Sequence, residues 1–281
     1  MKQMSGQTYR VGLAVMESVY DDIERNYRRM ESLIKQSAEQ AVELLIFPEL
    51  SLTGYCPEYA AQMALSRDHA IILSLRELAK RYGITTVAGC AEKTDGKPFN
   101  SQLICYADGK LGCYRKTHLG EKEKQYFRAG DSLPVFRGKL PFGVLLCYDT
   151  HFPEASTTLA LTGATMIVAP HASPYCAGLR KNLWDKYLPA RAYDNRVYLA
   201  CCNQTGSNGC GALFGGGAVV YTPEGTVLCE DYSGLESVLV ADLSISAVER
   251  FRGDDNCFNK KYFLAHRRPE LYEAERGGFS E

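Results

Sequence analysis

Short apolar runs alternate along the chain with segments in which apolar residues recur every three or four positions. The apolar runs predict strands at 9–16, 44–47, 84–90, 142–147, 165–169 and 197–202. The periodic segments predict helices at 21–40, 70–82 and 182–195, and a further helix beginning near Pro153-Glu154. Asp21 or Asp22 is a suitable N-cap for the first helix, and Gly83 a left-handed cap that ends the second. This alternation predicts a layered α/β fold.

Two hairpins are expected besides these units, with turns at Asp108-Gly109 and Pro223-Glu224-Gly225. Their arms are 101–107 with 111–115 and 218–221 with 227–229, and a last strand is expected at 237–243. Pro48 and Pro170 are expected to end the strands before them, because proline cannot donate to a ladder. The strands are apolar throughout, which is typical of sheets buried on both faces. We therefore predict a four-layer αββα sandwich, with two mixed sheets packed face to face, in a single domain over 1–281 whose C-terminal tail begins near residue 250.

Composition and charge describe an ordinary globular protein. Of the 281 residues 46% are hydrophobic and 23% charged, and the formal net charge is −1. No basic excess indicates binding to nucleic acid or to a membrane surface. No apolar run approaches the roughly 18 residues needed to span a bilayer, and the polar start lacks the apolar core of a signal peptide. A cytoplasmic location is therefore expected.

The eleven cysteines raise the question of disulfides or a metal site. No C-x-x-C pair occurs, and most of the cysteines lie inside apolar runs. Their odd number, these apolar neighbours and the lack of a secretion signal favour free thiols in a reducing compartment. The five histidines form no pair at helical spacing, so we predict neither a metal nor another cofactor.

Three side chains that suit acyl transfer each lie at the end of an apolar strand. Glu49 comes after 44–47, Lys116 ends the second arm of the first hairpin, and Cys147 ends 142–147. Sheet enzymes place functional groups at strand ends, where loops converge. A cysteine thiolate is a strong nucleophile, and a carboxylate can accept the thiol proton and later activate water. A lysine ammonium can stabilise the oxyanion of the tetrahedral intermediate.

Each of these residues also has a plainer interpretation. Cys147 would otherwise be a buried structural thiol, Glu49 a helix-start or loop carboxylate and Lys116 a solvated surface lysine. A cysteine–histidine dyad is the main mechanistic rival, because His151 lies four residues after Cys147. We expect Asp149 to be structural and to hydrogen-bond the turn that carries the nucleophile.

Three ordered blocks resemble the signature blocks of the nitrilase (carbon–nitrogen hydrolase) superfamily. They are FPELSLTGY, YRKTHL followed by FRAGD, and LLCYDTHFPE. Supporting blocks are GATMIVAPHASP, RAYDNRVYLACCNQTG, the TPEG turn and RRPELY. The resemblance runs from about residue 9 to about residue 272, nearly the whole chain, and implies an αββα sandwich that needs no cofactor.

The resemblance also implies roles for individual residues. Cys147 would attack the amide-like carbon, and Glu49 would be the general base. Lys116 and the backbone N–H of Tyr148 would hold the oxyanion. Many members carry a second active-site glutamate between the lysine and cysteine blocks. Glu123 fits its register before the aromatic pair and the Gly-Asp turn, and Glu121 is the competing choice.

The residues after Cys147 indicate the branch of the family. Tyr148-Asp149 resembles the amidases and carbamoylases, whereas nitrile-hydrolysing members have Trp-Glu there. The implied reaction is hydrolysis of a small amide or N-carbamoyl compound, which releases ammonia, and also carbon dioxide from a carbamoyl group. Thr150 and His151 stand where carbamoyl-D-amino-acid hydrolases carry arginines, so a carboxylate anchor is not expected at these positions. The candidates for lining the substrate pocket are Tyr55, Thr150, His151 and His171.

Other functions are compatible with the same blocks. They are a catalytically idle scaffold or binding protein, an acyltransferase, and a nitrilase using the same three residues. The ATP domain of the glutamine-dependent synthetases and the membrane helices of the apolipoprotein acyltransferases are not found in the sequence. Members commonly pair through surface helices, so we expect a homodimer or higher homo-oligomer in which 251–281 reaches a partner subunit. The other expected partner is a small-molecule substrate.

Overall fold

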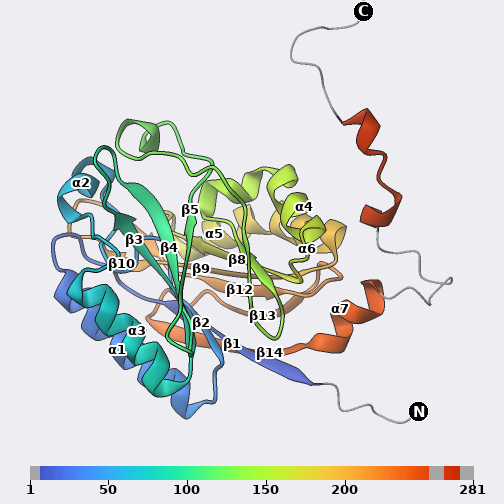
Figure 1. Cartoon of the computed structure of the whole chain (residues 1–281), viewed down its shortest axis with the longest axis horizontal. Coiled ribbons are helices and arrows are strands. Elements are labelled where there is room, and N and C mark those ends of the chain that lie inside the picture. The colour runs from blue at the N-terminus through green and yellow to red at the C-terminus, as the bar shows by residue number, and fades with distance from the viewer. Residues whose placement is uncertain (1–6, 253–262, 273–281) are drawn as a thin grey trace, which may run out of the picture.

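Two six-stranded sheets lie face to face at the centre of the molecule (Figure 1). The computed structural model describes residues 7–252 and 263–272. The first sheet has the order β14-β1-β2-β3-β4-β5. Its strands are β1 (Thr8–Val15), β2 (Leu44–Ile46), β3 (Thr85–Glu92), β4 (Phe99–Cys105), β5 (Leu111–Arg115) and β14 (Ser237–Ser244). β1, β2 and β3 are parallel and the remaining pairs are antiparallel, so this sheet is mixed.

The second sheet has the order β13-β12-β9-β8-β7-β6 and is also mixed. Its strands are β6 (Val135–Phe136), β7 (Phe142–Val144), β8 (Met166–His171), β9 (Tyr198–Asn203), β12 (Ala218–Tyr221) and β13 (Val227–Asp231). β7, β8 and β9 are parallel, so their carboxyl ends meet at one edge. A separate two-stranded ribbon consists of β10 (Thr205–Ser207) and β11 (Leu213–Gly215).

Helices cover the outer face of each sheet (Figure 1). The helices of the described residues are α1 (Ile23–Glu39), α2 (Ala60–Met63), α3 (Ala70–Tyr82), α4 (Pro153–Leu161), α5 (Ala177–Trp184), α6 (Leu188–Asn195) and α7 (Ile245–Arg252). α1 and α3 pack on the first sheet, and α4 and α6 on the second. The inward side chains of both sheets form one fully buried core between them. The predicted four-layer αββα sandwich is thus confirmed.

Local signals placed several elements correctly. The side chain of Asp22 accepts a hydrogen bond from the Arg25 N–H at 3.0 Å and caps α1. Gly83, with φ of 65°, ends α3 in the left-handed conformation. The Asp108-Gly109 turn joins β4 to β5 as an antiparallel hairpin.

Three predicted elements need correction. The helix predicted at 182–195 is two helices, α5 and α6, because Pro189 starts a new helix in the first turn of α6. The strand predicted to stop before Pro170 continues to His171. The Val168 carbonyl accepts a hydrogen bond from the Leu145 N–H, on the side of β8 that faces β7. Backbone groups alternate along a strand, so the backbone nitrogen of Pro170 points to the same side. At that point β7 has already ended, so no partner requires an N–H from residue 170. β7 itself ends at Val144, and Cys147 begins a 3-10 helix (Cys147–His151) instead of ending the strand.

The expectation of free thiols is wrong for one pair of cysteines. Cys56 and Cys210 form a disulfide, with their Cα atoms 6.4 Å apart. Cys56 precedes α2 and Cys210 lies between β10 and β11, so a sequence separation of 154 residues concealed the pairing. Eight cysteines of the described residues are free.

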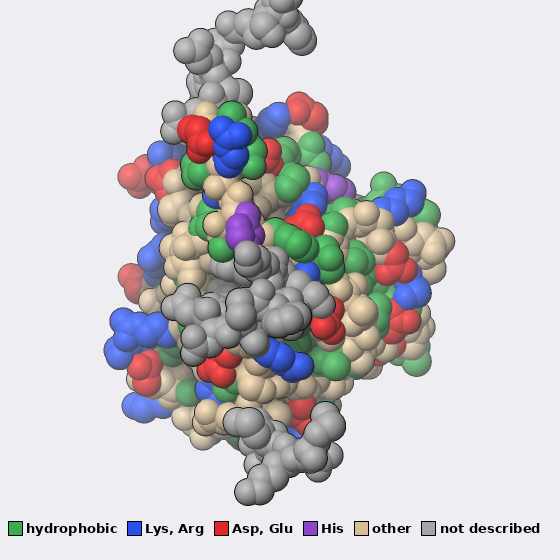
Figure 2. Space-filling view, turned by 90° about the vertical axis from the view of Figure 1, so that its right-hand side faces the viewer, with side chains coloured by type: hydrophobic (Ala, Val, Ile, Leu, Met, Phe, Trp, Pro, Cys, Tyr) green, Lys and Arg blue, Asp and Glu red, His purple; other side chains and the backbone are tan. Residues whose placement is uncertain are grey.

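The surface carries charges of both signs. On the face shown in Figure 2, Lys and Arg side chains are interspersed with Asp and Glu. Among the described residues, no helix is long and apolar enough to cross a membrane. The tail predicted at 251–281 falls largely on 253–262 and 273–281, which lie outside the described residues, so its expected contact with a partner subunit stays a prediction.

Candidate active site

Lys116 lies between two glutamates in the interior of the protein. Its Nζ is 2.7 Å from Oε1 of Glu49 and 2.8 Å from Oε1 of Glu123. The side chains of Lys116 and Glu49 are only 2% and 0% exposed. Charges buried to this degree are retained in proteins when they are paired. The structure therefore brings together three of the four residues predicted to carry the chemistry.

Glu123, and not Glu121, is the glutamate that contacts Lys116. Glu123 begins a short 3-10 helix (Glu123–Gln125), and its Oε2 accepts the Gly120 N–H at 2.9 Å. The side chain of Glu121 is 90% exposed and pairs with Lys124 at the surface.

Both sheets hold Glu49. In the first sheet, Asn100 on β4 donates to its Oε1 at 2.8 Å. From the second sheet, the Ala172 N–H just after β8 donates to its Oε2 at 2.9 Å, and Gln204 after β9 donates to its backbone carbonyl at 2.7 Å. The carboxylate therefore lies where the carboxyl ends of β2, β8 and β9 converge.

Gly89 on β3 allows the backbone that carries Glu49 to approach closely. A Cβ at this position would lie 2.2 Å from the backbone nitrogen of Leu50 and 2.9 Å from the carbonyl carbon of Glu49. Leu50 itself has φ of 51°, a left-handed conformation that is uncommon for leucine. The chain is thus sharply turned immediately after Glu49.

Cys147 lies on a second strained turn. Its φ is 42°, and it begins the 3-10 helix that follows β7. The Thr150 hydroxyl donates to the Cys147 carbonyl at 2.5 Å and stabilises this turn. The residue is partly exposed, whereas Leu145 and Leu146 before it are buried. The turn therefore places Cys147 at the edge of the core.

Asp149 ties the turn to the first sheet. Its Oδ2 accepts the Leu146 N–H at 2.9 Å and the Tyr114 hydroxyl at 2.7 Å. Its Oδ1 accepts the Thr117 hydroxyl at 2.9 Å and the His118 N–H at 2.8 Å. Tyr114 is the second residue before Lys116, so Asp149 links the two segments that carry Lys116 and Cys147. The predicted structural role of Asp149 is confirmed.

Burial and charge set the protonation of the group. Burial raises the pKa of Glu49 to about 7, with Lys116 opposing the rise and Glu123 adding to it. Burial and the Glu49 carboxylate raise the pKa of Cys147 to about 12, so its thiol is protonated at neutral pH. Burial alone would lower the pKa of Lys116, but Glu49 and Glu123 raise it well above its usual range. The arrangement is a protonated thiol, a permanent ammonium and a carboxylate with a pKa suited to proton exchange near neutrality.

The backbone N–H of Tyr148 is in a position suited to an oxyanion. It lies in the first turn of the 3-10 helix, where N–H groups have no intrahelical partner, and it has no acceptor among the described residues. Lys116 has three N–H bonds, of which two go to the glutamates. One ammonium hydrogen and one backbone amide therefore remain to bind an oxygen.

The four predicted pocket residues lie around this group in different ways. The Tyr55 hydroxyl is 3.4 Å from Oε1 of Glu123. Thr150 is fully buried and supports the Cys147 turn instead of facing outwards. The His151 ring packs on Tyr187, with centroids 4.4 Å apart, and partial burial and the charge of Arg191 lower its pKa. No hydrogen bond joins His151 to Cys147 in the described part of the chain.

His171 is the most enclosed of the histidines at the site. Its Nδ1 donates to the Ala169 carbonyl at 2.9 Å and is 3.2 Å from Sγ of Cys201, while its Nε2 has no partner within the described residues. Burial lowers its pKa well below the usual value, and the charge of Arg180 lowers it further. A neutral, fully buried imidazole of this kind packs beside the site and does not exchange protons with solvent.

Sequence reasoning missed Asn100, Ala172, Gln204 and Arg180. Asn100 stands 51 residues from Glu49 and Ala172 stands 123 residues from it, so no local pattern connects them. The available signals were polar residues near strand ends: Asn100 is the second residue of β4, and Gln204 directly follows β9. Arg180 lies in a helical segment with nothing in its surroundings to mark it.

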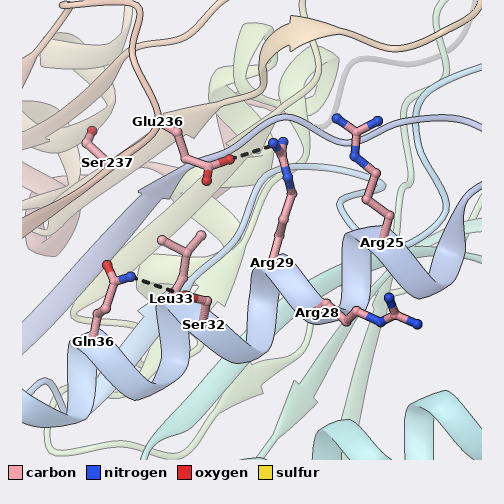
Figure 3. Close-up of a pocket in the computed structure, with 8 residues that line it drawn as sticks. All are labelled: Arg25, Arg28, Arg29, Ser32, Leu33, Gln36, Glu236 and Ser237. Atoms are coloured by element: carbon pink, nitrogen blue, oxygen red, sulfur yellow. Dashed lines mark hydrogen bonds and ion pairs between the residues drawn. The ribbon is translucent and has the colours of Figure 1, made fainter.

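A hollow of about 480 Å³ lies elsewhere, beside α1 and the start of β14 (Figure 3). Its lining includes Arg25, Arg28 and Arg29. Arg25 and Arg29 each pair with Glu17 at 2.8 Å, and Arg29 also pairs with Glu236. None of its lining residues is a cysteine, so it offers no nucleophile. Within the described ranges, no three metal-ligating side chains are grouped to hold an ion.

The sequence is similar to a known protein family and to several of its characterised members. The carbon-nitrogen hydrolase family profile matches residues 10–253. The chain is 33% identical over 238 residues to a nitrilase of Pyrococcus abyssi, covering 83% of this chain and 88% of that protein. It is 29% identical over 277 residues to the N-carbamoylputrescine amidase of Arabidopsis thaliana, covering 90% of each.

Solved structures of nitrilase-superfamily proteins are also similar to this chain. A variant of the nitrilase-superfamily amidase from Nesterenkonia AN1 superposes with a TM-score of 0.81 and 27% identity, over 95% of this chain and 96% of that one. The family profile spans most of the sequence, and the relatives include amidases and a carbamoyl amidase. The chain therefore belongs to the carbon–nitrogen hydrolase family.

Proposed function

We propose that this protein hydrolyses the C–N bond of a small amide or N-carbamoyl compound through a thioester on Cys147. The observation that carries the proposal is the buried Glu49–Lys116–Glu123 network, together with a thiol on a strained turn tied to it. Family membership supports amide hydrolysis in general. The arrangement of the side chains supports the individual steps of the reaction.

The first step forms a carbon–sulfur bond. The Cys147 thiol gives its proton to the Glu49 carboxylate as Sγ attacks the carbonyl carbon. The carbonyl electron pair moves to oxygen, and the resulting oxyanion accepts hydrogen bonds from Lys116 Nζ and the Tyr148 N–H. Because the pKa of the thiol is raised to about 12, proton transfer and attack need the adjacent base.

The second step breaks the C–N bond. The tetrahedral intermediate collapses, the amine leaving group takes the proton from Glu49, and ammonia departs to leave a thioester. In the third step water attacks the thioester and Glu49 accepts its proton. The C–S bond breaks, the thiol is protonated again and the acid is released. An N-carbamoyl substrate yields carbon dioxide in addition.

Glu123 acts in this scheme by positioning Lys116. Without Glu123, the ammonium would have a single acidic partner, Glu49, and would be free to turn towards it. With both glutamates accepting, the third N–H of Lys116 is directed away from them. The fixed donor requires no reorganisation when the oxyanion forms.

Relatives support a covalent step at the cysteine. One structure of the Nesterenkonia amidase, a glutamate-to-glutamine variant 28% identical to this chain, shows covalent addition of the acetamide moiety of fluoroacetamide at the active-site cysteine. We propose the same reactivity for Cys147.

The test is release of ammonia and carbon dioxide from primary amides, N-carbamoyl amines, N-carbamoyl amino acids and nitriles. The wild-type protein is compared with Cys147→Ala and with the control Cys113→Ala, which removes a thiol on β5. We expect turnover of at least one amide or carbamoyl compound that Cys147→Ala abolishes and Cys113→Ala retains. Turnover that survives in Cys147→Ala would refute the mechanism. No turnover of any compound by the wild-type protein would favour an acyltransferase or an idle scaffold.

A further inference from the structure

Arg180 is a buried guanidinium without a carboxylate partner. It lies on α5 and is 4% exposed. Its Nη2 donates to the Ser173 hydroxyl, and its Nε–H has no acceptor within the described residues. No ion pair of the described residues includes it, whereas its neighbour Lys181 pairs with Glu230 at the surface. Arginine is seldom buried in proteins unless it is paired.

The surroundings of Arg180 compensate only part of its charge. The Cζ atom of Arg180 lies 4.8 Å from the centroid of the Tyr175 ring and 5.6 Å from the centroid of the Trp184 ring. Such cation–π contacts are favourable, but they are weaker than the loss of hydration of a buried ion. A buried cation with an unused N–H therefore favours binding of an anion.

Arg180 lies beside the candidate catalytic group. Its partner Ser173 directly follows Ala172, whose N–H holds Glu49 at 2.9 Å. The charge of Arg180 contributes to lowering the pKa of both His151 and His171, after the larger effect of burial, and it opposes the rise in the pKa of Cys147. The charge of Arg180 therefore reaches three side chains of the candidate site.

We propose that Arg180 anchors a carboxylate of the substrate, so that the protein selects amides or N-carbamoyl compounds that carry a carboxylate at the end remote from the scissile bond. The inference rests on the proposed function and names its substrate class. A guanidinium matches the two oxygens of a carboxylate with parallel N–H donors. Nε–H is unused, and Ser173 already orients Nη2, so the donors are ordered before the substrate arrives.

The same charge rejects cationic substrates. A carbamoyl amine with a terminal ammonium would bring a like charge towards a guanidinium that has no counter-ion of its own. The chain is therefore expected to differ from the plant N-carbamoylputrescine amidases that it resembles, although it is 29% identical to the one from Arabidopsis thaliana.

The experiment compares three amides of equal length: the monoamide of glutaric acid, pentanamide and 5-aminopentanamide. For the wild-type protein, kcat/KM is expected to be about ten- to a hundredfold higher for the carboxylate than for pentanamide, and lowest for the cation. In Arg180→Met the ratio of the first two should fall to near one. Lys181→Met, which removes a charge from the next residue of α5, should keep the wild-type ratio. A wild-type ratio near one, or a ratio unchanged in Arg180→Met, would overturn the proposal.

A second measurement applies if Arg180→Met does not fold. Arg180→Lys keeps the charge but loses the planar fork. The ratio of kcat/KM for the monoamide of glutaric acid to that for pentanamide should therefore lie between the wild-type ratio and one. Glutarate, the expected product, should raise the Tm of the wild type and of Lys181→Met more than that of Arg180→Lys. Hydrolysis of pentanamide without preference for the carboxylate would refute the carboxylate-binding role of Arg180 and would leave the proposed hydrolase function intact. Glutarate binding dependent on Arg180, without turnover of any amide, would refute the hydrolase and support the anchor.

Discussion

Glu123→Gln tests whether the second glutamate acts through Lys116. Oε1 of Glu123 accepts from Lys116 Nζ at 2.8 Å, and its Oε2 accepts the Gly120 N–H at 2.9 Å. Glutamine keeps the shape but removes the charge and turns one acceptor into a donor. A hydrogen bond to a charged group contributes about 1.5–3 kcal/mol. We therefore expect kcat/KM to fall roughly 10- to 150-fold if this energy stabilises the transition state.

The substitution should also change the pH dependence. Glu49 must be unprotonated to act as a base, and burial raises its pKa to about 7, so kcat/KM should fall tenfold per pH unit below that value. The negative charge of Glu123 is one of the causes that raise this pKa. Removing that charge should lower the pKa of Glu49 and move the acid limb to lower pH.

The assay is ammonia release between pH 5 and 9, with Glu121→Gln as the matched control. The side chain of Glu121 is 90% exposed and pairs with Lys124, so its loss should change neither the rate nor the acid limb. An acid limb that stays in place while the rate falls would contradict the electrostatic link between Glu123 and Glu49. Equal effects of both substitutions would contradict the assignment of Glu123.

Three further predictions concern the support of the site. Gly89→Ala should lower the free energy of unfolding by about 1–3 kcal/mol and reduce activity, because its Cβ would lie 2.2 Å from the Leu50 nitrogen; urea denaturation checks this, and Gly96→Ala, with open space at its Cβ, should have little effect. Asp149→Asn should lower the free energy of unfolding by about 1–3 kcal/mol in the same assay, since an amide cannot accept every hydrogen bond that the carboxylate accepts. An unchanged free energy of unfolding would refute the structural role of Asp149. Thiol titration of the denatured protein should find two fewer thiols before reduction than after it, and Cys56→Ser should abolish the difference; equal counts in the wild type would exclude the disulfide.

The fold could be predicted where its signals are local. The helix at 70–82 and its end at Gly83 follow from apolar spacing and one glycine, and both agree with α3. Errors arose where the outcome depends on a neighbour in space. Pro170 can lie inside β8 because β7 ends before it reaches this position, so the missing N–H of proline leaves no acceptor on β7 without a partner. The disulfide of Cys56 joins loops 154 residues apart, and no local rule indicates it.

The candidate site was predicted in part for the same reason. Reactive side chains at strand ends pointed to Glu49, Lys116 and Cys147, because strand ends are recognisable in the sequence. The residues that hold them were not predictable in this way. The contact of Asn100 with Glu49 depends on the order of strands in the first sheet, and the contact of Ala172 depends on how the two sheets face each other.

The two left-handed residues at the site explain why its support extends so far. Leu50 and Cys147 take backbone conformations that cost about 1–3 kcal/mol each for residues other than glycine. Such strain persists only when the surroundings determine the conformation. At Cys147 they are the Asp149 hydrogen bonds, and next to Leu50 they are the contacts of both sheets with Glu49. The contacts that maintain these strained conformations also determine the charge environment of the Cys147 thiol and the Glu49 carboxylate. Stability and reactivity at this site therefore depend on one set of interactions.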